Sequence, residues 1–490
     1  MNTLPDPASP TPPPAPPAPP PPAIDPGRAR LVALLVAAAF FMENLDATVI
    51  TTAVPAMARS FGVAPVALSV GISAYLLALA VFIPVSGWVA ERFGARRVFA
   101  GAVLLFTLAS IACGLSQSLP VFVAARIAQG IGGALMVPVG RLVVLRATPK
   151  RDLVKAIATL TWPGLAAPVL GPPLGGWIAS TWSWHWIFFL NVPLGAVALV
   201  LALRWIDDAP GRRRPFDGIG FAASGIGLAA LMYGLDLWSH ATVDRPRALA
   251  FTLGGLGALA FALWHLRRAA HPLVDLSAFG VRTFRVSVVG GSLFRIAIST
   301  APFLLPLMFQ LAFGYDMVTS GFLMLALFAG NLGMKPATGL VLRRLGFRGT
   351  LLVNGLLVAL GFAACALLSP TTPLPALVAV LVFCGMCRSM QFTALNTLAF
   401  SDTSPAQTGG ATTLYSMFQQ LGAGIGIAFG AIALNVTERF TGHAGHPGVL
   451  DFRIALGAVA VLALLALIDM ARLPPDAGEE VVRRRATAAE

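Results

Sequence analysis

The chain has 490 residues, of which 57% are hydrophobic and only 11% are charged, and its formal net charge is +13. A soluble domain carries about 25% charged residues, so this composition excludes an ordinary soluble globular protein. Helices that span a membrane explain the deficit, because their outward side chains face lipid rather than water.

The chain begins with a proline-rich segment, residues 1–27, in which thirteen prolines lie between residues 4 and 26. This composition predicts an extended, disordered tail on the cytoplasmic side. It does not predict a signal peptide, because no apolar stretch follows a basic start.

Apolar runs of about 20 residues, each bounded by charges, proline or glycine, make up most of the remaining chain. They lie at 31–53, 66–88, 98–117, 121–145, 156–178, 185–205, 217–237, 247–266, 286–311, 318–342, 349–369, 374–399, 408–435 and 452–472. We therefore predict an all-α membrane protein with fourteen spans.

The basic residues indicate an orientation. An even number of spans places both termini on one side, and we place that side in the cytoplasm. Of the 34 Lys and Arg residues, 25 then lie in cytoplasmic segments, Arg141 among them, and only 5 lie in outer loops. This bias is typical of a bacterial inner-membrane protein. It also accounts for the net charge without any nucleic-acid partner.

Several function classes are excluded or disfavoured by missing patterns. The chain has no G-x-x-x-x-G-K-[ST] loop, which excludes a pump with its own nucleotide-binding domain. Its six histidines are scattered over loops and helix ends, so we do not expect an enzyme. We also expect no cofactor and no metal site. His443 and His446 on an outer loop are interpreted as solvated rather than as metal ligands.

Two carboxylates in the first run are out of place in lipid. Glu43 and Asp46 are three residues apart and share a helix face. Because two nearby carboxylates repel each other where water is scarce, at least one is expected to bind a proton readily. That is the chemistry of a proton-coupled carrier. In the alternative, Asp46 forms a static buried ion pair and Glu43 extends towards the cytoplasm.

Four cations also fall inside the predicted spans, namely Arg126, Arg295, Lys335 and Arg388. Charges in a membrane usually face a cavity and mark a pathway. Arg126 is expected either to tune a carboxylate or to organise hydrogen bonds. Arg295 and Arg388 either attract an anionic substrate or support packing, and Lys335 precedes Pro336 where a helix is expected to kink.

At these residues the chain resembles the major facilitator superfamily and, more narrowly, the fourteen-span drug:proton antiporters of the EmrB/QacA type. The resemblance covers residues 30 to 472. It rests on five segments in order, namely FFMENLDATVITTAVPAM (40–57), GWVAERFGARRVF (87–99), RIAQGIGGALMVP (126–138), APVLGPPLGGWI (167–178) and WHWIFFLNVPLG (184–195). The segment GLVLRRLGFRGT (339–350) is a degraded second copy of the 87–99 loop, which is consistent with an internal repeat.

The resemblance implies a major facilitator fold. The expected parts are a six-helix bundle at 28–206, two additional helices within 207–270, a second six-helix bundle at 271–473 and a cytoplasmic tail at 474–490. The loop after the second span is expected to act as a conformational latch, formed by Gly87, Glu91, Arg92, Gly94, Arg96 and Arg97. Glu91 replaces the usual Asp there. The antiporter motif corresponds to Gly171, Pro172, Gly175 and Gly176.

The function that the resemblance implies is proton-coupled export of small amphipathic or drug-like molecules by alternating access. Proton coupling is assigned to Asp46, Glu43 and Arg126. Candidate residues for the substrate cavity are Gln129, Arg295, Gln310, Arg388, Gln391, Asn396 and Gln419, because buried amides and cations need partners. An uptake permease of the same fold and a non-transporting membrane sensor or partner subunit remain alternatives, and a periplasmic adaptor is left open.

Overall fold

The structure is a computed structural model that describes residues 26–482, apart from 64–67, 208–214, 240–243 and 443–446. The predicted proline-rich tail therefore lies almost wholly outside the described residues, as do His443 and His446. Every regular element within the described ranges is a helix. A helix satisfies all its interior backbone hydrogen bonds within itself, which is what a segment in lipid requires.

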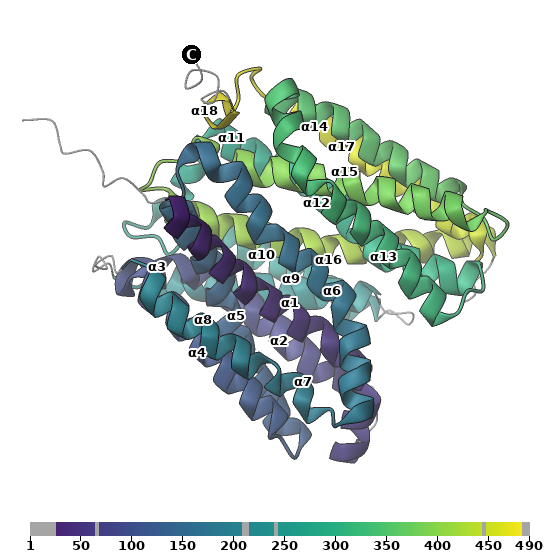
Figure 1. Ribbon diagram of the computed structural model, residues 1–490, viewed down its shortest axis with the longest axis horizontal. Helices are drawn as coiled ribbons and strands as arrows, with labels where there is room; N and C mark the ends of the chain where they lie inside the picture. The colour runs from purple at the N-terminus through teal and green to yellow at the C-terminus, as the bar shows by residue number, and fades with distance from the viewer. Residues whose placement is uncertain (1–25, 64–67, 208–214, 240–243, 443–446, 483–490) are drawn as a thin grey trace, which may run out of the picture.

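A first group of helices contains the residues up to Trp205 and is coloured purple to blue in Figure 1. Its helices are α1 Pro26–Phe61, α2 Ser69–Phe82, α3 Ser86–Phe93, α4 Ala95–Gly114, α5 Leu119–Ala147, α6 Leu153–Thr181, α7 His185–Phe189 and α8 Asn191–Trp205, with short 3-10 turns at η2 Ile83–Val85 and η3 Lys150–Asp152. Within the group, α1 packs along α6, and α5 packs between α2 and α4.

A second group begins after residue 270 and is coloured teal to yellow. It contains η4 Leu276–Gly280, α11 Arg282–Arg285, η5 Val286–Gly290, α12 Gly291–Leu307, η6 Met308–Ala312, α13 Met317–Gly333, α14 Lys335–Leu367, α15 Leu374–Ser401, α16 Thr408–Thr441, α17 Val449–Met470 and α18 Glu479–Val482. Here α13 packs along α15, and α14 packs against α15 and α17. The two groups lie side by side (Figure 1).

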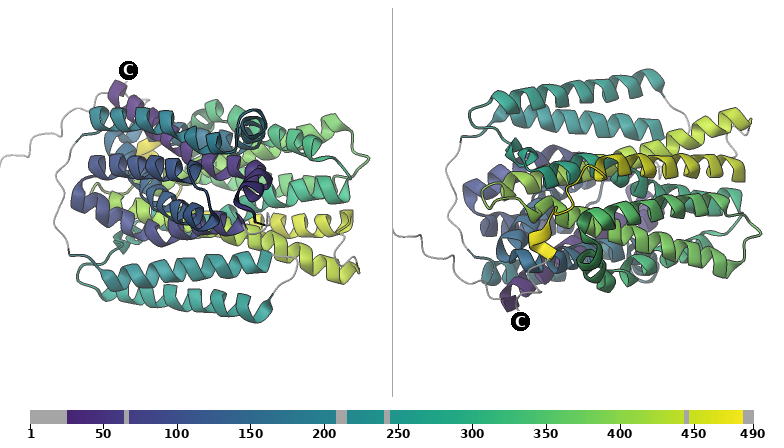
Figure 2. Two further views of the ribbon diagram at one scale, coloured as in Figure 1. Left: turned by 90° about the horizontal axis from the view of Figure 1, so that it is seen from below. Right: turned by 90° about the horizontal axis from the view of Figure 1, so that it is seen from above.

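A pair of helices, α9 Gly218–Ser239 and α10 Arg245–Arg268, lies outside both groups, at one edge of the molecule (Figure 2). The two helices pack along each other, and α9 contacts α2 of the first group and α16 of the second. Asp217 anchors the pair by accepting hydrogen bonds from the Gly220 and Leu273 amides and by bonding to His265. Although burial opposes it, these bonds hold the pKa of the Asp217 carboxyl below its usual value.

The two copies of the loop motif adopt the same turn. Gly94 separates α3 from α4 at φ 88°, and Gly346 interrupts α14 at φ 66°. Each lies seven residues after the first glycine of its motif, Gly87 or Gly339, and only glycine enters this backbone region without strain. The weak sequence repeat is therefore a structural repeat between the two groups of helices.

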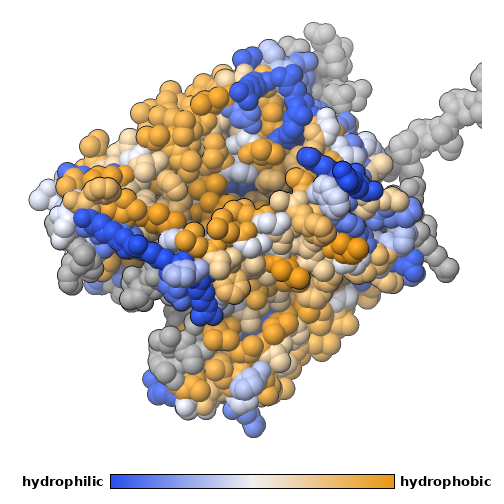
Figure 3. Space-filling model, turned by 180° about the vertical axis from the view of Figure 1, so that it is seen from behind, coloured by the Kyte–Doolittle hydropathy of each residue, from blue (hydrophilic) through white to orange (hydrophobic). Residues whose placement is uncertain are grey.

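The described residues include twelve helices that are long and apolar enough to cross a membrane. The predicted runs 156–178 and 318–342 are the two that are missing from this set. The second run corresponds to α13, which ends at Gly333. The helix is interrupted at Met334, and α14 begins at Lys335, just before Pro336. Hydrophobic side chains cover most of the face in Figure 3, as expected for a multi-pass membrane protein.

Candidate functional site

Asp46 of α1 and Arg126 of α5 form a closed ion pair inside the first group of helices. Arg126 Nη1 lies 2.6 Å from Asp46 Oδ2, and the two residues are 0% and 2% exposed, respectively. Gln129 of α5 and Asn191 of α8 each donate to Asp46 Oδ1 at 2.8 Å. The carboxylate thus has a counter-ion and two further donors, which is the arrangement that makes a buried charge tolerable.

Glu43 lies one turn before Asp46 but in a different environment. Its carboxylate lines a cavity between the two groups of helices, where Gly133 of α5 leaves room for it. The Tyr75 hydroxyl donates weakly to Glu43 Oε1 at 3.5 Å, while Oε2 has no hydrogen-bond partner in the described structure. The Tyr75 ring also lies over the Arg126 guanidinium at 4.3 Å, so it connects Glu43 to the closed ion pair.

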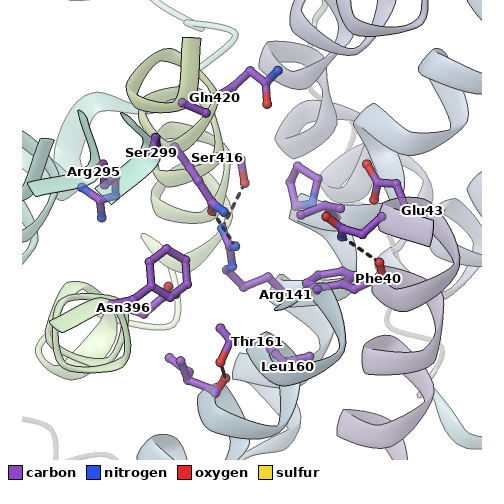
Figure 4. A pocket seen from close by; sticks show the side chains of 18 of the residues that line it. Phe40, Glu43, Arg141, Leu160, Thr161, Arg295, Ser299, Asn396, Ser416 and Gln420 are labelled. Atoms are coloured by element: carbon purple, nitrogen blue, oxygen red, sulfur yellow. Dashed lines mark hydrogen bonds between the residues drawn. The ribbon is translucent and has the colours of Figure 1, made fainter. Parts of the chain in front are cut away.

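The cavity has a volume of about 390 Å³ and draws its walls from both groups of helices. This size falls within the range of about 300–1,000 Å³ that is typical of small-molecule sites. Its lining mixes polar and apolar side chains, and the polar ones are Glu43, Asn44, Arg141, Thr161, Arg295, Ser299, Asn331, Arg388, Asn396, Ser416, Gln419 and Gln420. Figure 4 shows Arg141 in the middle, with Glu43 on one side and Arg295 on the other.

Arg141 and Arg295 share one aromatic ring. Their guanidinium carbons lie 4.5 Å and 4.7 Å from the ring centroid of Tyr415 in α16. Arg141 donates to Ser416 Oγ and Gln419 Oε1, both at 3.1 Å, and thereby joins α5 to α16. A desolvated cation–π contact is worth about 2 kcal/mol, whereas burying an ion costs several kcal/mol. The ring therefore does not replace a counter-ion.

Arg295 and Arg388 have donors that no acceptor satisfies. Arg295 Nη1 donates to the carbonyl oxygen of Ser287 at 3.0 Å, in the π-helical segment η5. Its Nε and Nη2, and Nη1 of Arg388, are buried without a hydrogen-bond partner among the described atoms. The side-chain nitrogen and oxygen of Asn331 in α13 are also buried without a hydrogen-bond partner among the described atoms. All three residues line the cavity.

Lys335 is a further cation beside the cavity. Its Nζ donates to Thr161 of α6 at 2.7 Å and to Thr393 of α15 at 2.9 Å, so it also joins the two groups of helices. Thr161 lines the cavity. Lys335 is therefore held by hydroxyl groups rather than by a carboxylate.

The predicted latch loop lies against the first turns of α16. A Cβ atom on Gly87 would lie 2.6 Å from Thr413 Oγ1, and one on Gly409 would lie 2.9 Å from Glu91 Oε1.

The arginines of the loop lie in different surroundings. Arg96 donates to the carbonyl oxygen of Leu203 at the end of α8. Arg92 is half-buried and Arg97 is exposed, while Gly94 forms the turn.

The predicted antiporter motif lies in the middle of α6, the helix that packs along α1. A Cβ atom on Gly171 would lie 2.2 Å from Thr48 Oγ1, so this glycine permits a close approach of the two helices. Gly176 has open space beside it, and Gly175 is buried. The side chain of Pro172 lies outside the described part of the structure.

The structure brings four of the seven predicted cavity residues together, namely Arg295, Arg388, Asn396 and Gln419. The other three lie elsewhere. Gln129 belongs to the ion-pair network, Gln310 lies within reach of Ser320 at 3.4 Å, and Gln391 accepts a hydrogen bond from Asn354 at 2.9 Å.

Sequence reasoning missed Arg141 and Asn331. Arg141 was counted with the cytoplasmic cations, but it is 6% exposed and lies in the cavity wall. Its position inside the helix, six residues before the end of α5, is the signal that could have revealed it. Asn331 has no such signal, because its environment depends on how α13 packs.

The fold and the site can be compared with known proteins. The sequence model of the family described as the Major Facilitator Superfamily matches residues 36–427. The "Probable transport protein HsrA" of Haemophilus influenzae is 36% identical over 89% of this chain and 94% of its own length. The "Putative multidrug resistance protein MdtD" of Pectobacterium carotovorum is 36% identical over 90% of this chain and 95% of its own.

Solved structures show the same fold at low sequence identity. The human organic anion transporter MFSD10 (TETRAN) matches with a TM-score of 0.66 at 16% identity, over 90% of this chain and 99% of that one. The proton:xylose symporter XylE matches with a TM-score of 0.63 at 14% identity, over 94% of this chain and 99% of that one.

Proposed function

The chain belongs to the Major Facilitator Superfamily, so it is a membrane transporter and not an enzyme, and on this premise we propose that it exports small amphipathic molecules in exchange for protons. The observation that carries the proposal is the position of Glu43. It is a carboxylate with an unpartnered oxygen in the wall of a cavity between two groups of helices.

The role of Glu43 follows from its contrast with Asp46. Asp46 has Arg126 as a counter-ion and is not free to exchange a proton without leaving that cation buried and unpaired. Among the described residues, Glu43 has only the weak hydrogen bond from Tyr75. We assign proton binding to Glu43, and we assign to Asp46 and Arg126 the support of the helices that hold it.

The membrane topology of the proposal has fourteen spans. Besides the twelve helices identified by length and composition, α6 and the combination of α13 with the first part of α14 are proposed to cross the membrane. The two groups of helices then correspond to six-helix bundles at 28–206 and 271–473, with two additional helices within 207–270. Both termini lie in the cytoplasm of a bacterial inner membrane, as the distribution of basic residues favours.

Alternating access is supported by where the two groups of helices touch. The side-chain hydrogen bonds between them that involve Ser86, Arg141 and Lys335 all lie towards the end of the molecule at which α1 and α6 begin. With the N-terminus in the cytoplasm, this conformation is closed on the cytoplasmic side. The loop 87–97 at the start of α16 is the proposed latch, and Gly171 in α6 permits the sliding contact with α1.

The names of two relatives support the export of small molecules, since one is a probable transport protein and the other a putative multidrug resistance protein. The lining also agrees, because it includes apolar side chains such as Phe40, Leu160 and Phe392 as well as polar ones. An uptake permease would share this fold, so the direction of transport has to be measured.

The test uses everted membrane vesicles that contain the protein and three probes of one shape. They are naphthalenesulfonate, neutral naphthalenesulfonamide and cationic naphthyltrimethylammonium. We expect at least one probe to accumulate when the vesicle interior is acidic and to leak out when the pH gradient is collapsed. Accumulation that ignores the gradient, or outward movement from acidic vesicles, would contradict proton-driven export.

A further inference from the structure

The charge of the cavity wall identifies the kind of substrate. Three arginines, Arg141, Arg295 and Arg388, line the cavity, and Glu43 is the one acidic residue among the lining residues that the structure describes. Accepting the export function proposed above, we propose that the transported molecules are small organic anions with an apolar body, whose carboxylate or sulfonate binds Arg295 and Arg388.

The free donors of Arg295 have the geometry that an oxyanion requires. Nε and Nη2 are adjacent donors on one side of the guanidinium group, and together they can grip both oxygens of a carboxylate. In this structure both atoms are buried and unpartnered, while Nη1 on the other side is bound to the Ser287 carbonyl oxygen. Arg295 is thus anchored through Nη1, while Nε and Nη2, the pair that can bind two oxygens at once, make no hydrogen bond in this structure.

Arg388 and Asn331 supply further free donors in the same cavity. Nη1 of Arg388 and the amide nitrogen of Asn331 are buried without a partner, and both residues line the cavity with Arg295. They come from α15 and α13, whereas Arg295 comes from α12. Three helices of one group therefore present unsatisfied donors, and a bound oxyanion would satisfy them together.

No acid in the described structure neutralises these cations. Arg141 and Arg295 share the Tyr415 ring, and each donates to its own neutral oxygen acceptors. Lys335 is bound to two threonine hydroxyls. A buried charge without a counter-ion is costly, so this wall favours an anionic ligand and opposes a cationic one. A cation would have to bind at Glu43 while the nearby guanidinium groups repel it.

The apolar part of the ligand is specified by the remaining lining. Leu79, Ile83 and Val137 come from the first group of helices, and Ile298 comes from α12 beside Arg295. These side chains form an apolar surface that can contact a hydrocarbon or aromatic body, and they make no hydrogen bonds. An inorganic anion would leave that surface uncovered, so the cavity fits an amphipathic anion better.

The test measures equilibrium binding of the three naphthalene probes to the purified protein by dialysis. Naphthalenesulfonate is expected to bind most tightly, the sulfonamide more weakly and naphthyltrimethylammonium least. Arg295→Gln and Arg388→Gln should each weaken sulfonate binding by about tenfold to a hundredfold, as expected for the loss of a hydrogen bond to a charged group. Arg295→Lys should retain part of the affinity, because it keeps the charge but loses the bidentate fork.

Arg267→Gln is the matched control, since Arg267 is exposed on α10 and its loss changes the net charge equally. It should leave all three affinities unchanged. Equal or tighter binding of the cation, absence of sulfonate binding, or sulfonate binding that survives both cavity substitutions would overturn the proposal. The comparison of probes on the unmodified protein decides the matter even if one variant fails to fold.

The two proposals fail in different ways. If the cationic probe binds and is driven by the pH gradient, the export function stands and the anionic substrate is wrong. If the sulfonate binds through Arg295 and Arg388 but no probe is driven by the gradient, the anion site stands and the export function is wrong.

Discussion

Two sets of buried charges, both surrounded mostly by apolar helices, differ in how they are compensated. In the first group of helices, Asp46 and Arg126 form an ion pair, and Gln129 and Asn191 satisfy the second oxygen of the carboxylate, although Arg126 Nε has no hydrogen-bond partner among the described atoms. In the cavity wall, Arg295 and Arg388 keep unpartnered nitrogens and Glu43 keeps an unpartnered oxygen. A compensated charge holds a structure together, whereas an uncompensated one is ready to bind something that the structure lacks.

This comparison predicts the largest effect for Asp46→Asn. The substitution leaves the Arg126 charge buried without a counter-ion, which is expected to lower the free energy of unfolding by about 3–5 kcal/mol. Thermal unfolding of the purified protein measures the effect. Asp207→Asn serves as the control, because Asp207 is exposed in its pair with Arg28 and such pairs contribute about 0–1 kcal/mol.

The double variant Asp46→Asn with Arg126→Gln sharpens the same point. Removing both charges eliminates the unpaired cation, so the double variant should be more stable than Asp46→Asn alone. Equal stability of the single and double variants would mean that Asp46 does not compensate the buried charge of Arg126.

Gly87→Ala is expected to have the next largest effect. The added Cβ would lie 2.6 Å from Thr413 Oγ1, so the Thr413 side chain or the loop itself must shift, at a cost of about 1–3 kcal/mol. Because the contact between the loop and α16 joins the two groups of helices, we expect its loss to change the transport rate. Gly101→Ala is the control, since nothing lies within 4 Å of its Cβ position. An unchanged rate for Gly87→Ala would remove the loop from the switching mechanism.

Arg295→Gln should behave in the opposite way to Asp46→Asn. Because no described residue acts as a counter-ion to Arg295, its removal is expected to keep or raise the stability of the ligand-free protein, by about 1 kcal/mol. Thermal unfolding without ligand is the measurement. A loss of several kcal/mol would mean that Arg295 is compensated after all and would break the comparison.

The smallest effect is expected for Tyr75→Phe, which tests whether the two sets of charges communicate. The variant keeps the ring over Arg126 but removes the long hydrogen bond to Glu43. Its cost should be below about 1 kcal/mol, with a change of only a few-fold in the transport rate. A loss of proton coupling in this variant would show that Tyr75 carries the link between the two regions.

Much of this arrangement could be predicted from the sequence. The apolar runs predict the helices, because lipid forces a hydrophobic composition and a length of about 20 residues on each span. The alternative in which Asp46 forms a buried ion pair was also open, since Arg126 falls in another predicted span. The glycines at 94 and 346 confirm the internal repeat that the two motifs suggested.

The cavity wall could be predicted only in part. Arg295 and Arg388 were candidates because a charge in a span is costly, but the direction in which a helix faces depends on packing between distant segments. For that reason Gln129 and Gln391, which look equivalent to Asn396 in sequence, lie outside the cavity. Arg141 was missed because a cation near a helix end usually extends to the membrane surface.

The most direct test of the central claim is substrate-driven proton flux in proteoliposomes that carry a pH-sensitive dye. The unmodified protein, Glu43→Gln and the double variant of Asp46 and Arg126 are compared after the addition of the probe that is transported best. Proton flux should vanish in Glu43→Gln and persist in the double variant. Undiminished flux in a folded Glu43→Gln protein would contradict the assignment of the transported proton to the cavity carboxylate.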